Sequence, residues 1–176
     1  MSISRIPFGL LLAIAVLFHG SATVSEARET KKEEADKYMK VLKTSKDNKA
    51  RIEALKGLGE LSQVQVELAK PAVPLFVEAI KDKDTMVRAA AAENYGKIDL
   101  SDKSDQLKAL IDMVKNDKEE KVKEAAAKGL GAMGSDAKEA IPTLREAAKA
   151  ASSTTKNGKA PPYYGMVMQQ INGSKK

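Results

Sequence analysis

The chain has 176 residues, with no cysteine, no tryptophan and a single histidine. This length suits one domain, and the absence of cysteine excludes disulfides, thiolate nucleophiles and Cys-ligated metal centres. The 30 basic and 24 acidic residues give a net charge of +6 and are interleaved along most of the chain. That balance is weak support for nucleic acid as a partner. Because 43% of the residues are hydrophobic but only 4% aromatic, we expect an aliphatic core rich in small side chains.

Residues 1–27 have the pattern of an export signal. Arg5 precedes an apolar run of eleven residues from Phe8 to Phe18, which is shorter than the ~20 residues that a membrane-spanning helix needs. A basic start, a short apolar core and a small-residue exit are typical of a secretory signal peptide. The alternative is a buried N-terminal helix, but the segment 28–33 that follows is entirely polar.

Small residues place the predicted cleavage site. Ser25 and Ala27 occupy positions −3 and −1 of a site after Ala27, and cleavage after Ala22 is the competing possibility. We expect an exported protein, periplasmic or secreted, with no stable membrane span after cleavage. His19 would leave with the signal, so the mature chain would contain no histidine.

The remainder of the chain repeats itself with a period near 35 residues. The segments 47–61, 82–98 and 117–133 each begin with a charged loop, continue as a helix with a basic residue after Ala or Val, and have glycine near the end. A second motif, Ala-Lys-x-Ala-(Val/Ile)-Pro, occurs at 69–74 and again at 137–142. Such internal repetition is the sequence signature of a repeat architecture.

Both helices of each unit show the helical apolar period, and no segment shows a sustained period of two. In the first helices, the spacing i, i+3, i+4, i+7 is carried by Ala35, Tyr38, Met39 and Leu42, then by Val73, Phe76, Val77 and Ile80, then by Leu107, Leu110, Ile111 and Val114. The second helices carry alanine at the centre of the stripe, as in Val87, Ala90, Ala91, Tyr95 and Ile98, and in Val122, Ala125, Ala126, Leu130 and Met133. One unit cannot bury both of its helices, so we predict an all-α solenoid of about four stacked helical hairpins.

The Val-Arg-x-x-Ala-Ala pattern at 87–92 and the two Ala-Lys-x-Ala-(Val/Ile)-Pro motifs resemble those of the HEAT-repeat family, in particular the HEAT-like repeats named after phycobilisome (PBS) lyases. The resemblance covers residues 34–151. It implies antiparallel helix pairs stacked into a right-handed superhelix. It also implies a ladder in which an acidic loop residue and the basic residue six positions later bind across adjacent repeats.

The resemblance assigns five residues to this ladder. Asp82 with Arg88, and Asp117 with Lys123, have the required spacing of six. Arg51 departs from the pattern, because the residue six positions before it is a serine, Ser45.

The C-terminal segment predicts a loop, a helix and a tail. Residues 152–160 are small and polar, which predicts a loop. Within 161–172, apolar residues again follow the helical period, which predicts a capping helix that completes a fourth unit: Tyr164, Val167, Met168 and Ile171. Gly165 weakens that helix by ~1 kcal/mol relative to alanine, and the alternative is a disordered tail. Residues 173–176 form a basic tail.

Two motifs could suggest a ligand. Residues 129–134 match G-x-G-x-x-G, but a dinucleotide loop requires a preceding strand, whereas an Ala-rich helix precedes them here. Asp99, Asp102 and Asp105 could suggest calcium, but the spacing of an EF-hand is absent, and Ser and Asp before a helix more often cap it. We therefore predict no catalytic residue, no cofactor site and no metal site.

The sequence leaves three functions open. The leading hypothesis is a non-catalytic exported scaffold that binds another protein along one face of the solenoid. The alternative is electrostatic binding to an anionic polymer or membrane surface through tail lysines without compensating acids: Lys156, Lys159, Lys175 and Lys176. The third, an enzyme, is suggested only by the word lyase in the family's name, and a fold does not fix a function.

Overall fold

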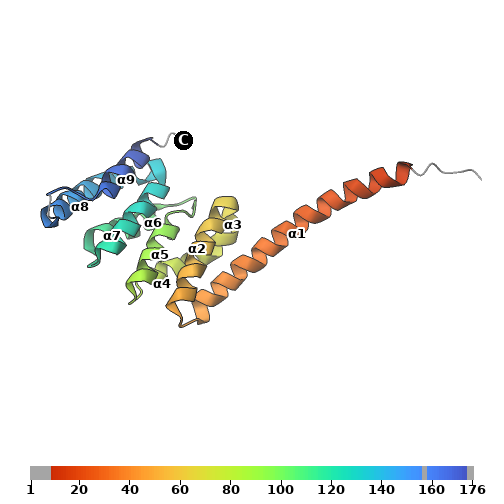
Figure 1. Ribbon diagram of the computed structural model, residues 1–176, viewed down its shortest axis with the longest axis horizontal. Helices are drawn as coiled ribbons and strands as arrows, with labels where there is room; N and C mark the ends of the chain where they lie inside the picture. The colour runs from red at the N-terminus through yellow and green to blue at the C-terminus, as the bar shows by residue number, and fades with distance from the viewer. Residues whose placement is uncertain (1–8, 156–157, 174–176) are drawn as a thin grey trace, which may run out of the picture. The chain divides into compact units, whose positions relative to one another are not determined.

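The computed structural model describes residues 9–155 and 158–173, with side chains from residue 26 onward. Every regular element in this part of the chain is a helix, which confirms the predicted all-α solenoid (Figure 1). The first helix, α1 (Gly9–Thr44), crosses the boundary between two compact units, residues 1–34 and 35–176. Among the described residues, no helix combines the length and the apolarity required to cross a membrane.

The first unit contains the whole predicted signal segment, residues 1–27. Residues 9–34 of this unit are helical, and the polar segment 28–33 lies within that helix. Residues 1–8 fall outside the described part of the chain. Export and cleavage after Ala27 therefore stay predictions.

The second unit consists of four consecutive helical hairpins, each with a first helix (A helix) and a second helix (B helix). The A helices are residues 35–44 of α1; α3 (Val66–Ala69), η1 (Lys70–Ala72) and α4 (Val73–Ala79); α6 (Ser104–Asn116); and η2 (Gly134–Ala140) with α8 (Ile141–Thr154). The B helices are α2 (Asn48–Val64), α5 (Thr85–Tyr95), α7 (Glu120–Ala132) and α9 (Pro162–Gly173). Successive B helices pack against one another, α2 on α5, α5 on α7 and α7 on α9.

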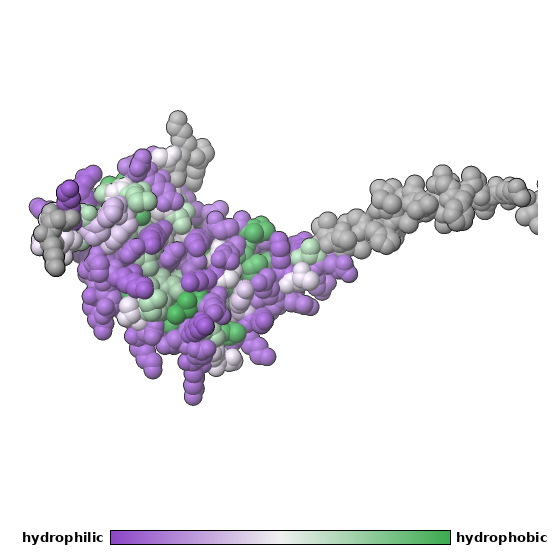
Figure 2. All heavy atoms as spheres, in the orientation of Figure 1, coloured by the Kyte–Doolittle hydropathy of each residue, from purple (hydrophilic) through white to green (hydrophobic). Residues whose placement is uncertain are grey.

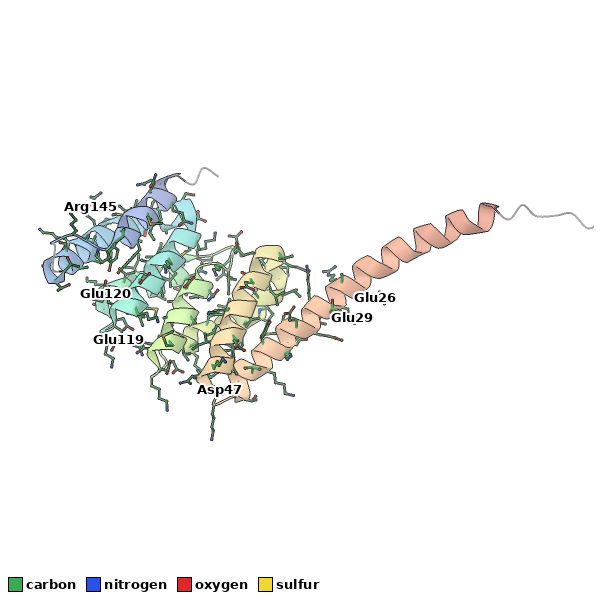
Figure 3. All side chains as sticks on the ribbon, viewed as in Figure 1. Glu26, Glu29, Asp47, Glu119, Glu120 and Arg145 are labelled. Atoms are coloured by element: carbon green, nitrogen blue, oxygen red, sulfur yellow. The ribbon has the colours of Figure 1, made fainter. Side chains whose placement is uncertain are left out.

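Aspartates begin two of the B helices. Asp47 accepts a hydrogen bond from the N–H of Lys49 at the start of α2, and Asp84 accepts from Met86 and Val87 at the start of α5. These bonds satisfy N–H groups that have no partner inside the helix. In Figure 3, Asp47 and Glu119 mark the starts of α2 and α7.

The predicted capping of α6 takes a modified form. The cap position is Lys103, whose side chain makes no capping bond. Asp102 instead accepts hydrogen bonds from the Ser104 N–H at 2.9 Å and the Ser104 hydroxyl at 2.6 Å. Asp102 therefore caps α6 from the residue before the N-cap position.

The Ala-Lys-x-Ala-(Val/Ile)-Pro motifs build equivalent bends in two A helices. In each, a 3-10 turn leads into an α-helix that has proline in its first turn, Pro74 in α4 and Pro142 in α8. Proline is tolerated there because that N–H needs no intrahelical partner. The alanines of the two motifs are completely buried: Ala69, Ala72, Ala137 and Ala140.

The prediction of a loop over 152–160 is wrong for its first three residues, because α8 continues to Thr154. The hydroxyls of Ser152, Ser153 and Thr154 donate hydrogen bonds to the carbonyls three residues before them, at 2.7, 2.7 and 2.9 Å. These local bonds let the polar residues continue the helix. Residues 156–157 lie outside the described part of the chain, as do residues 174–176 of the predicted tail.

The C-terminal helix α9 occupies the B position of the fourth hairpin. Tyr164, Val167 and Ile171, three of the residues that carry the predicted apolar stripe, are buried. Gly131 of α7 lies against α9, and a Cβ added there would come within 2.8 Å of Gln170. The side chain of Gln170 therefore lies over Gly131, and the buried apolar stripe packs α9 against α7.

The closest helix packing in the stack involves two glycines. A Cβ added to Gly96, at the end of α5, would lie 2.1 Å from the backbone oxygen of Gly129 in α7. A Cβ added to Gly129 would lie 2.5 Å from the backbone oxygen of Ala92. Backbone therefore meets backbone where α5 and α7 cross, and any side chain there would force the helices apart.

We expect Gly129→Ala to destabilise the fold by about 2 kcal/mol, since the new methyl group has no room. For a chain of this size, the melting temperature would fall by roughly 4–8 °C. Thermal unfolding followed by circular dichroism measures the change.

The matched control is Gly165→Ala, because Gly165 lies in α9 with no atom within 4 Å of an added Cβ. There the higher helix propensity of alanine should stabilise by up to ~1 kcal/mol. Equal effects of the two substitutions would contradict the backbone contact.

Candidate functional site

The loops before the B helices hold a ladder of ion pairs between repeats. Arg51 of α2 donates from Nη2 to Oδ2 of Asp82 at 2.5 Å. Arg88 of α5 donates from Nε to Oδ2 of Asp117 at 2.9 Å, and from Nη2 to Oδ1 at 3.2 Å. Each arginine thus reaches the aspartate that precedes the next B helix.

Each ladder aspartate also organises its own loop. Oδ1 of Asp82 accepts the N–H of Asp84 at 2.8 Å, and Oδ1 of Asp117 accepts the N–H of Glu119 at 2.9 Å. Arg88 donates to the backbone carbonyl of Asp82 at 2.9 Å as well. Arg88 is only 7% exposed, and these bonds compensate the cost of burying its charge.

The pairs shift the acid–base equilibria of their members. Burial alone would raise the pKa of Asp117, but the hydrogen bonds from Arg88 and from the Glu119 N–H lower it overall. The pKa of Asp82 is lowered against burial in the same way, by the Asp84 N–H and by Arg51. The hydrogen bond to Asp117 raises the pKa of Arg88.

The two ends of the ladder differ from its middle. Ser45 lies where the first repeat would have its ladder aspartate. Its hydroxyl accepts the N–H of Asp47 at 3.1 Å, as the aspartates of the later loops do, but it offers no charge for an ion pair. Lys123, the fifth residue assigned to the ladder, makes no ion pair with any residue that the structure describes. The structure therefore brings together Arg51 with Asp82 and Arg88 with Asp117, but leaves Lys123 outside these pairs.

Two further polar contacts between elements carry no signature in the repeat motif. Lys103 binds Asp136 at 2.6 Å, which joins the starts of the third and fourth A helices. Gln106, almost fully buried, donates from Nε2 to the carbonyls of Tyr95 and Ile98 at the end of α5. The sequence could have indicated the role of Gln106, because the equivalent residues in the neighbouring repeats are the alanines Ala72 and Ala140.

A groove is lined by residues of three successive B helices, α2, α5 and α7. We call it the B-face groove. It has a volume of about 240 Å³. Its floor is apolar and its margins are charged: Ile52, Met86, Ala89, Ala90 and Ala125 form the floor, and Lys56, Glu93, Lys121, Glu124 and Lys128 the margins. On the face seen in Figure 2, small apolar patches are likewise surrounded by hydrophilic side chains.

The groove combines exposed apolar surface with charges of both signs. Met86 is 42% exposed although it is a large apolar side chain. Glu124 and Lys128 pair across one turn of α7 at 2.8 Å, and this hydrogen bond raises the pKa of Lys128. Lys56 and Lys121 make no ion pair within the described part of the chain, so their charges are available to a ligand.

The two ligand-like motifs have structural roles in the described chain. Gly129 and Gly131 lie inside α7 and are covered by α5 and α9, so no phosphate-binding loop is formed. Asp99 pairs with Lys103. Among the described residues, no group of three or more His, Cys, Asp and Glu side chains is arranged to hold a metal ion.

Comparison with known proteins matches two family models to the second unit. The model described as HEAT repeats matches residues 35–117, and the model described as PBS lyase HEAT-like repeat matches residues 122–150. The two matched segments of the chain are HEAT repeats. Both matches fall within the predicted repeat region 34–151. No curated protein matches the chain significantly.

The HEAT repeats coincide with the hairpins of the structure. The first match covers the first two hairpins and all of α6, and the second runs from α7 into α8. Proteins of this family typically mediate protein interactions and are typically non-catalytic. The B-face groove lies entirely on helices within the matched HEAT repeats, apart from Lys121, which falls between the two matches.

We expect Asp117→Asn to destabilise the protein by about 2–3 kcal/mol at pH 7, because the buried guanidinium of Arg88 would lose its counter-charge. The folded pKa of Asp117 is lowered. Its stabilising contribution is therefore present above the unfolded pKa of about 4 and is lost as the pH falls through the folded pKa. The gap in the free energy of unfolding between variant and parent should begin to narrow below about pH 4, in urea unfolding curves measured from pH 7 to pH 2.5.

Glu124→Gln is the control for this experiment, because it breaks the more exposed pair with Lys128. Its expected cost is below about 0.5 kcal/mol. A gap between Asp117→Asn and the parent that stays constant down to pH 2.5 would contradict the role of the carboxylate charge.

Proposed function

We propose that this chain is a non-catalytic, exported HEAT-repeat protein that binds another protein in the B-face groove. The observation that carries the proposal is the groove itself, which continues over three successive repeats with an apolar floor and charged margins. Such a surface offers hydrophobic burial at its centre and charge complementarity at its rim, the usual arrangement of a protein interface. The interaction role typical of HEAT repeats supports the same conclusion.

The chemistry of the groove favours a partner segment with apolar anchors and charges of both signs. The floor alanines are small, so a partner side chain can approach the helices closely beside Met86 and Ile52. Two lysines without an ion pair, Lys56 and Lys121, favour acidic groups at the edge of such a segment. Glu93, half-buried on α5 at the margin of the same groove, favours a basic or hydrogen-bond-donating group.

We expect Met86→Glu to reduce capture of the partner at least tenfold, because it places a charge on the apolar floor. The measurement is cross-linking of the tagged full chain in cells, followed by mass spectrometry of the captured proteins. Met166→Glu is the matched control, since Met166 is an even more exposed methionine, at 68%, on α9 outside the groove.

Equal capture by the two variants would contradict binding in the groove, and so would the absence of any protein captured by the parent. Electrostatic binding to an anionic polymer or membrane surface, the alternative, would decrease steeply with salt and would not depend on Met86. Three of the lysines that suggest this alternative, Lys156, Lys175 and Lys176, lie outside the described residues, so it stays a prediction.

The export part of the proposal has its own test. We expect the exported protein to begin at Arg28, after cleavage at Ala27, or at Thr23 if Ala22 is used instead. N-terminal sequencing of the protein from the periplasmic and culture fractions measures the site. A protein that remains inside the cell with its first 22 residues attached would contradict export.

A further inference from the structure

We propose that the pocket between α6, α7, α8 and α9 binds a carboxylate of an acidic peptide segment, which completes the ladder at Lys123. The inference rests on the proposed function as an interaction protein, but it concerns a different surface from the B-face groove. We call this cavity the end pocket. It has a volume of about 300 Å³ and receives side chains from all four helices.

The repeat pattern itself specifies the missing partner of Lys123. Arg51, Arg88 and Lys123 occupy the same position in successive B helices. Arg51 binds an aspartate 31 residues later, and Arg88 binds one 29 residues later. In the first two repeats, a carboxylate therefore always meets this position.

At the same sequence separation from Lys123, 29 to 31 residues, the chain has no carboxylate. Residues 29 to 31 positions later are Ser152, Ser153 and Thr154. Their hydroxyls donate to the carbonyls of their own helix. Lys123, which is half-buried, thus retains a cationic ladder position for which the chain supplies no aspartate.

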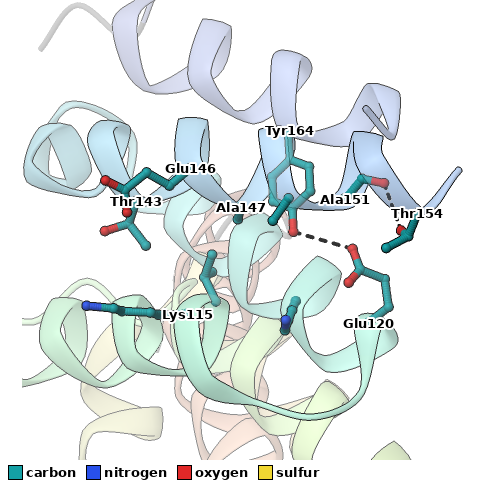
Figure 4. A pocket seen from close by; sticks show the side chains of 11 residues that line it. Lys115, Glu120, Thr143, Glu146, Ala147, Ala151, Thr154 and Tyr164 are labelled. Carbon is teal, nitrogen blue, oxygen red and sulfur yellow. Dashed lines mark hydrogen bonds between the residues drawn. The ribbon is translucent and has the colours of Figure 1, made fainter. Parts of the chain in front are cut away.

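The end pocket provides the surroundings that a carboxylate needs. Lys115 of α6 lies in the same pocket as Lys123, so two ammonium groups are available. Thr143 adds a hydroxyl from α8, and the small residues Ala147 and Ala151 leave space for an incoming side chain. Figure 4 shows α8 along one side of the pocket, with Lys115 and Glu120 on the opposite side.

Two carboxylates of the chain itself also line the end pocket, and their contacts differ. Glu120 accepts hydrogen bonds from the hydroxyls of Tyr163 at 2.6 Å and Tyr164 at 3.4 Å (Figure 4 shows the latter). Burial, and then the bond to Glu120, raise the pKa of Tyr163, so this hydroxyl keeps the proton that it donates. Glu146 lies exposed on α8 without an ion pair in the described structure, and it is the internal competitor for Lys123.

The test uses the full chain and a synthetic hexapeptide that contains three aspartates, with the same peptide carrying asparagines as its control. NMR titration follows the signals of the lysine side chains. We expect saturable shifts of the Lys123 signal with the aspartate peptide, and binding at least ~10-fold weaker with the asparagine peptide. Read from the signal of Lys115 in the same pocket, Lys123→Gln should abolish binding of the aspartate peptide, while Lys123→Arg should preserve it.

Three further measurements distinguish binding of a peptide carboxylate from loss of the fold, from pairing with Glu146 and from binding of any anion. Because Lys123 makes no ion pair with described residues, Lys123→Gln should leave the melting temperature nearly unchanged, which excludes loss of the fold as the cause. Binding of the aspartate peptide only after Glu146→Gln would show that Glu146 already completes the ladder, and would overturn the proposal. Equal binding of inorganic phosphate and of the aspartate peptide would overturn the choice of a carboxylate.

The Met86→Glu variant distinguishes the two proposals. It should retain the response of Lys123 to the aspartate peptide while it loses the partner captured in the groove. Failure at the groove with an intact Lys123 response would overturn only the groove. The absence of any Lys123 response to the aspartate peptide would overturn only the end pocket.

Discussion

The side chains of Asp82 and Asp117 each make two kinds of contact, one within their own loop and one with the preceding repeat. In each, Oδ1 accepts the N–H of the loop before a B helix and Oδ2 accepts a hydrogen bond from the arginine of the preceding repeat. At Asp117, Arg88 also donates to Oδ1. Local order in one hairpin therefore places the acceptor that the neighbouring hairpin needs. Because repeats contact mainly their neighbours, this coupling joins the first three hairpins into one stack.

The fold could be predicted from the sequence because its signals are local and repeated. Apolar spacing predicts both helices of each hairpin, and the recurrence of Val-Arg and Ala-Lys-x-Ala motifs predicts that the hairpins stack. Some polar contacts between repeats could not be predicted from the sequence. Lys103 and Asp136 belong to no motif, and only the stacking of the third and fourth A helices brings them together.

Polar residues at helix ends explain the other differences. Composition alone predicts a loop over residues 152–154, but short hydroxyl side chains can bond to their own helix and extend it. Gln106 lies where other repeats have alanine, and its burial follows from the open carbonyls at the end of α5. Its remaining oxygen, Oε1, is buried without a partner in the described structure. The B-face groove could not be predicted, since it depends on which faces of three helices remain uncovered after they stack.

The meeting of Gly96 and Gly129 has a consequence for how the repeats are ordered. Their sequences look interchangeable, but the surfaces between them are not, since α5 and α7 fit together only where both helices lack a side chain. The equivalent glycines Gly59 and Gly131 meet the side chains of Asn94 and Gln170 instead of backbone. Each boundary between B helices is therefore fitted to its own pair of neighbours, although glycine recurs at the same position in α2, at the end of α5 and in α7.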